Sequence, residues 1–207
     1  MRPVRTLVVG SLLAALLVAV PSAAHAVAPS SATWSPVAPR HEGDGYAATA
    51  AVVDPRNVSM AADGGIVLYD RTAARIRLID ASTGVITSLA GDGSPVSHCG
   101  LTAGTDARTI ALPEPRTLAP APDGDLFVLM AGYYACDSPG VARLDHTDHQ
   151  WHLVAAQPSS SERYTKGYGD FTSVAVGSDG TAYVGDGFGH RILAYAPGSD
   201  PTAMGTV

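Results

Sequence analysis

The sequence has little positive charge. Lys166 is the only lysine, and 19 acidic residues outnumber the 13 Lys and Arg residues, so the 207-residue chain has a formal net charge of −6. Surfaces that bind nucleic acid or anionic lipid through phosphate groups need clustered Lys and Arg. The sequence therefore predicts a protein that binds neither nucleic acid nor, once exported, a membrane.

Known catalytic motifs are also absent. The sequence contains no Gly-x-Ser-x-Gly elbow, no His-Glu-x-x-His zinc motif and no glycine-rich phosphate loop. The Asp-Gly pairs at 63–64, 123–124 and 179–180 lack the alternating acidic residues and distal Glu of an EF-hand calcium loop. These absences favour a protein that is not an enzyme, and we predict no catalytic residues, no metal and no cofactor.

Long apolar runs are confined to the N-terminus. Arg2 and Arg5 precede an apolar stretch from Leu7 to Val20, and the small residues Ala24-His25-Ala26 follow it. This order is typical of a secretory signal peptide, and 14 apolar residues are few for a membrane span. We predict a signal peptide at 1–26 and a secreted, extracellular protein.

Three Asp-Gly pairs mark an internal repeat. Asp63-Gly64, Asp123-Gly124 and Asp179-Gly180 each separate two apolar runs, at intervals of 60 and 56 residues. Gly accepts positive φ and Asp bonds to its own backbone, so each pair predicts a hairpin turn. A loop and an Arg-aliphatic run follow each hairpin, which predicts a meander of four strands. We place the copies at about 54–91, 114–156 and 170–207.

One four-stranded sheet is too small to bury both of its faces. Sheets repeated at this period are typical of a β-propeller, in which neighbouring blades cover one another. The sequence therefore predicts an all-β fold with about three four-stranded antiparallel blades. Because a closed propeller needs about four to eight blades, the chain is either a partial ring or half of a six-bladed ring completed by a homodimer.

The repeats resemble those of NHL-repeat propellers, as found in secreted bacterial NHL-repeat-containing proteins. The first copy has the strand end Leu68-Tyr69-Asp70 and the Arg-aliphatic strand Arg75–Ile79. The third copy matches through Tyr183–Asp186 and His190-Arg191-Ile192, whereas the second keeps only Arg143-Leu144. The resemblance covers about residues 43–207 and implies a binding or interaction scaffold at the cell exterior.

Residues 27–42 precede the repeats and are rich in Ala, Ser and Pro. One interpretation is a flexible export linker. In the other, Thr33–Ala38, which contains Trp34, is an outermost strand that pairs with the last blade and closes the ring.

The connections between copies and the loops between second and third strands lie at one end of a propeller, which we call the loop face. Residues 92–113 and 157–169 are such connections, and a helical turn is predicted within Asp106–Leu112. We predict that a protein or glycan ligand binds on the loop face, where His190 also has a structural role before the Arg-aliphatic strand. The predicted ligand-binding residues are Tyr133, Tyr134, Phe188 and His190.

Both cysteines, Cys99 and Cys136, also fall in loops of the loop face. Two cysteines in an exported chain predict one disulfide, with free thiols or a metal pair as the alternatives. In the chain-entropy model such a bond contributes about 3–4 kcal/mol to stability.

Three histidines, His146, His149 and His152, lie in a turn between two predicted strands. On a helix their spacing would suggest a metal site. In a turn the rings need not converge, so we predict a solvated polar turn. We also expect Asp70 and Asp186, at the ends of second strands, to cap loops or pair with an arginine such as Arg75 or Arg191.

Two further functions stay open. Some propellers of this type are metal-assisted lyases or hydrolases, whose ligands come from several blades. The first strands of the three copies offer only Asn57 as a plausible ligand, so such a site would lie partly outside this chain. The chain is alternatively part of the sensor ectodomain of a longer receptor.

Overall fold

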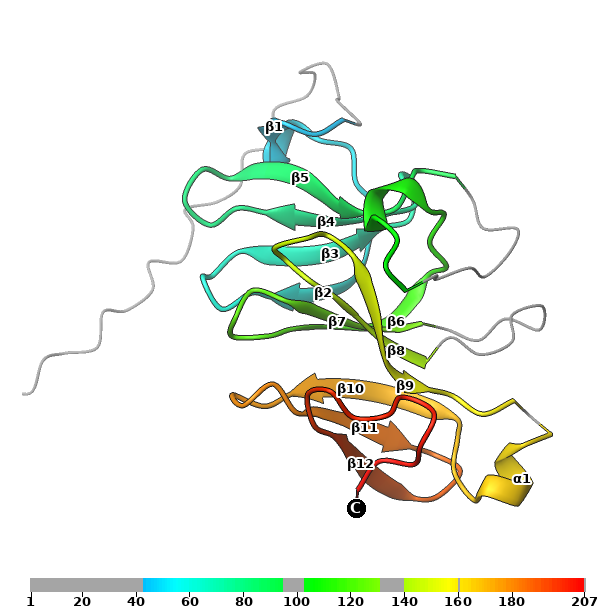
Figure 1. Ribbon diagram of the computed structural model, residues 1–207. Helices are drawn as coiled ribbons and strands as arrows, with labels where there is room; N and C mark the ends of the chain where they lie inside the picture. Colours follow the sequence, from blue (N-terminus) through cyan, green and yellow to red (C-terminus); the bar gives the residue numbers. More distant parts are fainter. Residues whose placement is uncertain (1–42, 95–102, 131–139, 160, 207) are drawn as a thin grey trace, which may run out of the picture. The chain divides into compact units, whose positions relative to one another are not determined.

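Three antiparallel sheets follow one another along the chain (Figure 1). The structure is a computed structural model that describes residues 43–94, 103–130, 140–159 and 161–206. The predicted signal peptide, the 27–42 linker with its alternative closing strand, and four predicted site residues lie outside these ranges, so those predictions stay untested. The four residues are Tyr133, Tyr134, Cys99 and Cys136.

Blade 1 is a four-stranded meander with one added outer strand. Its strands are β2 (Pro55–Met60), β3 (Ile66–Asp70), β4 (Arg75–Ile79) and β5 (Val85–Ala90). The added strand is β1 (Tyr46–Ala47), which runs antiparallel to β5 and precedes the short 3-10 turn η1 (Ala48–Ala50). Sequence analysis predicted no strand here, because two residues carry no strand pattern of their own.

Blade 2 has the predicted four strands. They are β6 (Pro115–Pro120), β7 (Leu126–Met130), β8 (Gly140–Leu144) and β9 (Trp151–Ala156). The helical turn expected within Asp106–Leu112 is confirmed as η2 (Ala107–Thr109), and the Asp106 side chain caps it by accepting a hydrogen bond from the Arg108 N–H.

Blade 3 has three strands, β10 (Phe171–Val176), β11 (Ala182–Asp186) and β12 (Arg191–Tyr195). Within the described residues, the place of a fourth strand is taken by an isolated bridge between Ala194 and Thr206. The short helix α1 (Arg163–Lys166) precedes the blade. No helix in the described ranges is long and apolar enough to cross a membrane.

The Asp-Gly pairs form the predicted turns. The side chains of Asp63, Asp123 and Asp179 each accept a hydrogen bond from the backbone N–H two residues later, at 2.9, 3.1 and 3.0 Å. The following glycines have φ of 87°, 100° and 80°, which residues with a Cβ rarely adopt. We call the end of the blades that carries these turns the turn face.

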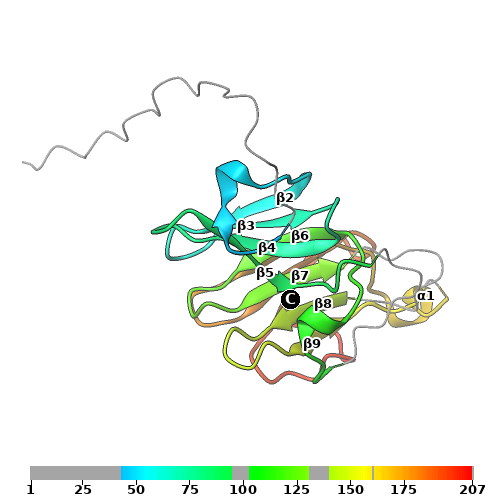
Figure 2. The ribbon, with the colours of Figure 1, turned by 90° about the horizontal axis from the view of Figure 1, so that it is seen from above.

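The blades pack face to face. Val67, Tyr69 and Ile76 of blade 1 share a buried core with Leu126 and Val128 of blade 2. A second core joins the other side of blade 2, including Phe127 and Val141, to blade 3. The first strands β2, β6 and β10 lie next to one another, and Figure 2 shows the blades from above. Consecutive meanders stacked in this way form about three blades of a β-propeller.

A buried aspartate ends the second strand of blades 1 and 3. As predicted, Asp186 pairs with Arg191, at 3.3 Å, and it also accepts the Gly169 N–H. Asp70 instead pairs with Arg77, at 3.1 Å, whereas Arg75 reaches the Asp92 carbonyl. Asp70 caps the following loop as expected, by accepting the Thr72 and Ala73 N–H groups. Its arginine partner is Arg77 and not the predicted Arg75, whose side chain turns toward the next connection.

Candidate functional site

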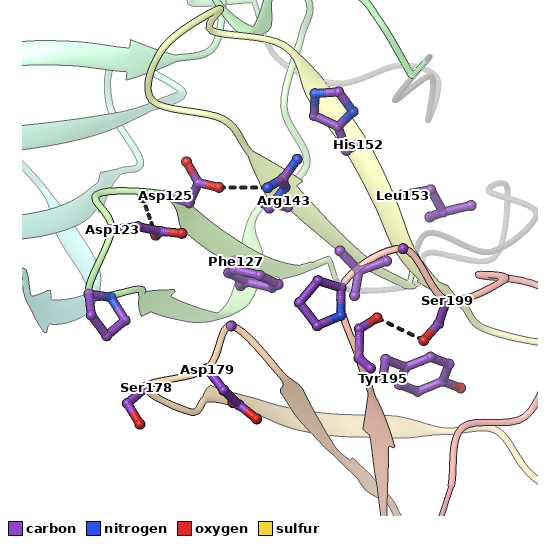
Figure 3. A pocket seen from close by; sticks show the side chains of 16 residues that line it. Asp123, Asp125, Phe127, Arg143, His152, Leu153, Ser178, Asp179, Tyr195 and Ser199 are labelled. Atoms are coloured by element: carbon purple, nitrogen blue, oxygen red, sulfur yellow. Dashed lines mark hydrogen bonds and ion pairs between the residues drawn. The ribbon is translucent and has the colours of Figure 1, made fainter.

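A cavity opens on the turn face, between blades 2 and 3 (Figure 3). Its volume is about 610 Å³. Turns of both blades line it, together with side chains from β7, β8, β9 and the end of β12. The residues that matter to its chemistry are Asp125, Phe127, Arg143, His152, Leu153 and Tyr195.

Aromatic residues form a fixed part of the lining. Phe127 and Tyr195 belong to the core between blades 2 and 3, and both are buried. Burial raises the pKa of the Tyr195 hydroxyl, so it stays protonated at neutral pH. Leu153 on β9 is different, because its side chain is exposed beside the cavity.

The charged groups of the cavity are already paired. Arg143 Nη1 lies 2.9 Å from Asp125 Oδ2, and its Nη2 lies 3.6 Å from Asp145 Oδ2. The other oxygen of Asp125 accepts hydrogen bonds from His146 Nδ1 at 2.8 Å and from the His146 N–H at 3.0 Å. These contacts hold the guanidinium of Arg143 in place while part of it stays accessible.

The same contacts shift two ionisation equilibria. The hydrogen bond to Asp125 raises the pKa of His146. Hydrogen bonds from the hydroxyl and N–H of Thr147 lower the pKa of Asp145 to about 2. Asp145 is therefore a fixed anion at neutral pH.

Among the described residues, two groups of side chains have a composition that suits a metal ion. Asp125, Asp145 and His146 form one, Asp145, Asp148 and His152 the other, and the ligand atoms in each lie within 4.8 Å of one another. In the first group Arg143 already bonds both carboxylates. A cation there would have to displace the guanidinium, so the arrangement favours an Arg-Asp-His network.

The three histidines predicted to lie in a solvated polar turn line two different cavities. His152 lines the cavity between blades 2 and 3, whereas His146 and His149 line a smaller one, of about 420 Å³, between blades 1 and 2. His149 has a φ of 58°, as the turn requires. His146 and His149 lie in the turn and His152 on β9, so the three residues do not form a single site.

On the loop face, the structure places Phe188 against an aromatic residue that sequence analysis did not single out. The rings of Phe188 and Tyr164 are perpendicular, with centroids 5.3 Å apart, and Tyr164 of α1 is 77% exposed. His190 is exposed and has a φ of 52°, similar to 50° at Ala74, which also precedes an Arg-aliphatic strand. These observations are consistent with a turn-forming role for His190, and its predicted role in ligand binding stays open.

Sequence analysis missed the turn-face cavity. Arg143 was noted only as a repeat position, and Leu153, Phe127 and Tyr195 were not singled out. His152 and Leu153 are consecutive on β9, so their side chains point to opposite faces of the sheet. This is a local signal that one of the two lies outside the core. No local signal reveals that the turns of two blades stand apart, because that depends on how the sheets pack.

Three stacked meanders define the class of this protein, a β-propeller-type fold with about three blades. No protein-family model matches the sequence, and no curated protein matches it.

Several solved structures are similar in fold. One is a structural genomics protein of unknown function from Bacteroides thetaiotaomicron VPI-5482, with 14% identity and a TM-score of 0.47 over 69% of this chain and 34% of that chain. Another, described as YCF48 bound to D1 peptide, has 14% identity and a TM-score of 0.45 over 75% and 41%. Virginiamycin B lyase from Staphylococcus aureus has 12% identity and a TM-score of 0.39 over 70% and 39%.

This chain thus spans well under half the length of each of these three proteins. At these scores the likenesses assign neither an activity nor a ligand, and the fold class rests on the sheets themselves.

Proposed function

We propose that this chain is an exported, NHL-like propeller module that binds a segment of another protein on its turn face. The export signal pattern of residues 1–26 and the Asp-Gly and Arg-aliphatic blade pattern support this proposal. The ligand site we assign is the cavity between blades 2 and 3.

One observation carries the proposal: the cavity combines fixed polar groups with an apolar rim. Arg143 and His152 offer hydrogen-bonding groups from adjacent strands, where they stand opposite each other. Leu153, Pro122 and Pro197 supply apolar surface close by. A cavity with a few oriented polar groups and apolar walls is typical of a ligand site, and the ion pairs of Arg143 reduce the entropy lost on binding.

A protein segment suits this lining better than a glycan does. An extended backbone presents carbonyl groups to Arg143, while an apolar side chain of the ligand contacts Leu153 and the prolines. A sugar ring stacks best on an exposed aromatic face, and both aromatic residues of the cavity are buried.

The competing proposal, a metal-assisted lyase or hydrolase, draws on the Asp125–His146 pair. A His held by a carboxylate is the usual arrangement of a general base. Among the described residues, however, no hydroxyl or thiol bonds the other nitrogen of His146. Asp145, with a pKa of about 2, is too weak a base to take a proton at neutral pH.

The test uses the full chain as bait for a phage-displayed library of random peptides and for an array of immobilised glycans. We expect enriched peptides whose affinity falls at least about tenfold, or about 1.4 kcal/mol, when Leu153→Glu places a charge beside the cavity. His152→Ala removes one polar group and should have a smaller effect in the same direction.

The matched control is the double variant Tyr164→Ala/Phe188→Ala, which alters only the loop face. It should leave peptide affinity unchanged. If it abolishes binding while Leu153→Glu does not, the ligand site lies on the loop face and our assignment is wrong. Glycan binding without peptide binding contradicts the proposal that the ligand is a protein segment. One divalent ion per chain retained through dialysis favours the metal-assisted lyase or hydrolase.

A further inference from the structure

Both ends of the row of blades expose an apolar sheet face. In each blade we call the face toward the preceding blade the leading face and the face toward the following blade the trailing face. Blade 2 buries both. Blade 1 leaves its leading face, and blade 3 its trailing face, without a neighbouring blade among the described residues.

The trailing faces can be compared position by position, because the sheet registers of the three blades match. Ile76 stands opposite Tyr69, Val141 opposite Leu129 and Ile192 opposite Gly185, so these three residues are equivalent. Ile76 and Val141 are each 0% exposed between two blades, whereas Ile192 is 62% exposed. Tyr183, on the same face as Ile192, is also exposed, whereas its equivalents Val67 and Phe127 are buried.

The leading faces show the same contrast at the other end, along β2 and at the start of β3. Val58, Leu118 and Val174 are equivalent, since each lies five residues before the Asp of its Asp-Gly turn. Leu118 and Val174 are each 5% exposed, whereas Val58 is 61% exposed. Ile66 is likewise exposed, and its equivalents Leu126 and Ala182 are buried.

The segments that precede blades 1 and 2 repeat this pattern. Before blade 2, Ala107 and Leu112 fill the core between blades 1 and 2. Ala47 and Val52 hold the equivalent places before blade 1, 60 residues earlier. Ala47 is exposed and Val52 is half-buried. Blade 1 therefore carries, on its leading face and in the segment before it, apolar residues equivalent to those that contact a preceding blade in blade 2.

We propose that two copies of this chain associate by packing the trailing face of blade 3 of each copy on the leading face of blade 1 of the other. The chain already makes this type of contact twice within itself, so one sequence supplies both halves. A two-fold arrangement uses both exposed faces of both copies and closes into a six-bladed ring. Apolar side chains exposed together on one sheet face commonly mark a protein interface.

Polar contacts along the first strands complement the apolar match. The Asn57 side chain of blade 1 donates to the Pro115 carbonyl of blade 2, and Arg116 of blade 2 donates to the Phe171 carbonyl of blade 3 at 3.2 Å. Pro55 is the residue of blade 1 equivalent to Pro115 and Phe171. Across the proposed contact, Thr172 holds the position of Arg116, since each lies seven residues before the Asp of its Asp-Gly turn. Its hydroxyl donates to the Gly185 carbonyl of its own blade at 3.3 Å, so it must rotate to reach the Pro55 carbonyl of the other copy.

The test is the molar mass of the full chain by size-exclusion chromatography with light scattering. We expect the mass of two chains for the wild type and of one chain for either Ile192→Lys or Val58→Lys, each of which charges one exposed face. Tyr164→Lys, at an exposed aromatic residue outside both faces, is the control and should remain dimeric. Near-UV circular dichroism of each variant should match that of the wild type, which excludes simple unfolding.

Mixing the two monomeric variants tests the head-to-tail arrangement. A dimer of one Ile192→Lys chain and one Val58→Lys chain has two contacts between blade 3 and blade 1. One contact carries both substitutions and the other carries none, so the mixture should recover dimers that neither variant forms alone. A monomeric wild type overturns the proposal. A dimer that only one of the two substitutions disrupts also overturns it, because two like faces would then be in contact. A molar mass that keeps rising with concentration overturns it as well, because the copies would then form an open chain and not a closed ring.

Discussion

Arg77 and Asp70 form an ion pair at 3.1 Å in which both side chains are buried. Asp70 also accepts hydrogen bonds from the backbone N–H groups of Asp54, Thr72 and Ala73. One carboxylate thus joins β3, β4, the following loop and the segment that leads into β2.

Removing the Arg77 side chain should strongly destabilise the fold. Arg77→Ala leaves the carboxylate of Asp70 buried without its counter-charge, which typically costs about 3–5 kcal/mol. The free energy of unfolding in urea measures this loss. The control is Arg108→Ala, which breaks an exposed pair with Asp106 and should change stability little; equal losses in both variants would contradict the special role of the buried pair.

The Asp125–His146 contact should make stability depend on pH. Asp125 raises the pKa of His146 in the folded state, so protonated His146 stabilises the fold. That contribution is complete below the unfolded pKa of about 6.5 and disappears as pH rises through the folded value. The stability difference between wild type and His146→Gln should therefore shrink from mildly acidic to alkaline pH. A stability difference that grows with rising pH would show that protonated His146 destabilises the fold, which contradicts the prediction.

Asp145 should respond to loss of its hydroxyl partner. The Thr147 hydroxyl lies 2.6 Å from Asp145 Oδ1 and helps to lower the pKa of Asp145 to about 2. Thr147→Val should raise that pKa toward the ordinary value, as carboxyl chemical shifts in an NMR titration would show. In the wild type the stabilisation by ionised Asp145 is present above the unfolded pKa and is lost as pH falls through about 2. An unchanged pKa in Thr147→Val would assign the shift to the backbone N–H groups and the charge of Arg143.

Gly91 should not tolerate a side chain. Its φ is 98°, and an added Cβ would lie 2.5 Å from the Ala74 carbonyl oxygen. Gly91→Ala should cost clearly more than the roughly 1–3 kcal/mol of backbone strain alone. Gly84→Ala is the matched control, because Gly84 also has positive φ, at 67°, but an added Cβ meets no atom within 4 Å. Thermal unfolding of both variants compares strain with and without a clash.

The predicted Cys99–Cys136 disulfide is tested by intact mass with and without reduction. We expect no free thiol in the exported chain, and a loss of about 3–4 kcal/mol of stability in Cys99→Ala/Cys136→Ala. Two alkylatable thiols in the unreduced protein would disprove the bond. A bound metal removed by a chelator would support the metal alternative instead.

The repeat could be predicted from sequence because its turns depend on local chemistry. Asp63, Asp123 and Asp179 bond to backbone two residues away, and each is followed by a glycine that accepts positive φ. Neither property needs a distant partner. The same holds for the capped turn at Asp106 and for the pairing of Asp186 with Arg191, which are five residues apart.

The candidate site was predicted less well, because it depends on contacts between sheets. Phe188 was placed on the loop face, but its partner Tyr164 belongs to a separate segment. The cavity with Arg143 and His152 lies at the opposite end, between turns that approach one another only when blades 2 and 3 pack. Periodicity within a strand assigns a side chain to a face and does not say what stands across from that face.

The sequence by itself determined the three sheets, their turns and which residues alternate across each strand, since these follow from backbone conformation and local hydrogen bonds. Only the tertiary structure decided that Asp70 pairs with Arg77 instead of Arg75, and that Ile76 is buried whereas the equivalent Ile192 is exposed. Both residues are isoleucines at the same place in a blade. Their burial differs because hydrophobic stabilisation requires a second surface, and the position of that surface is a property of the packed blades.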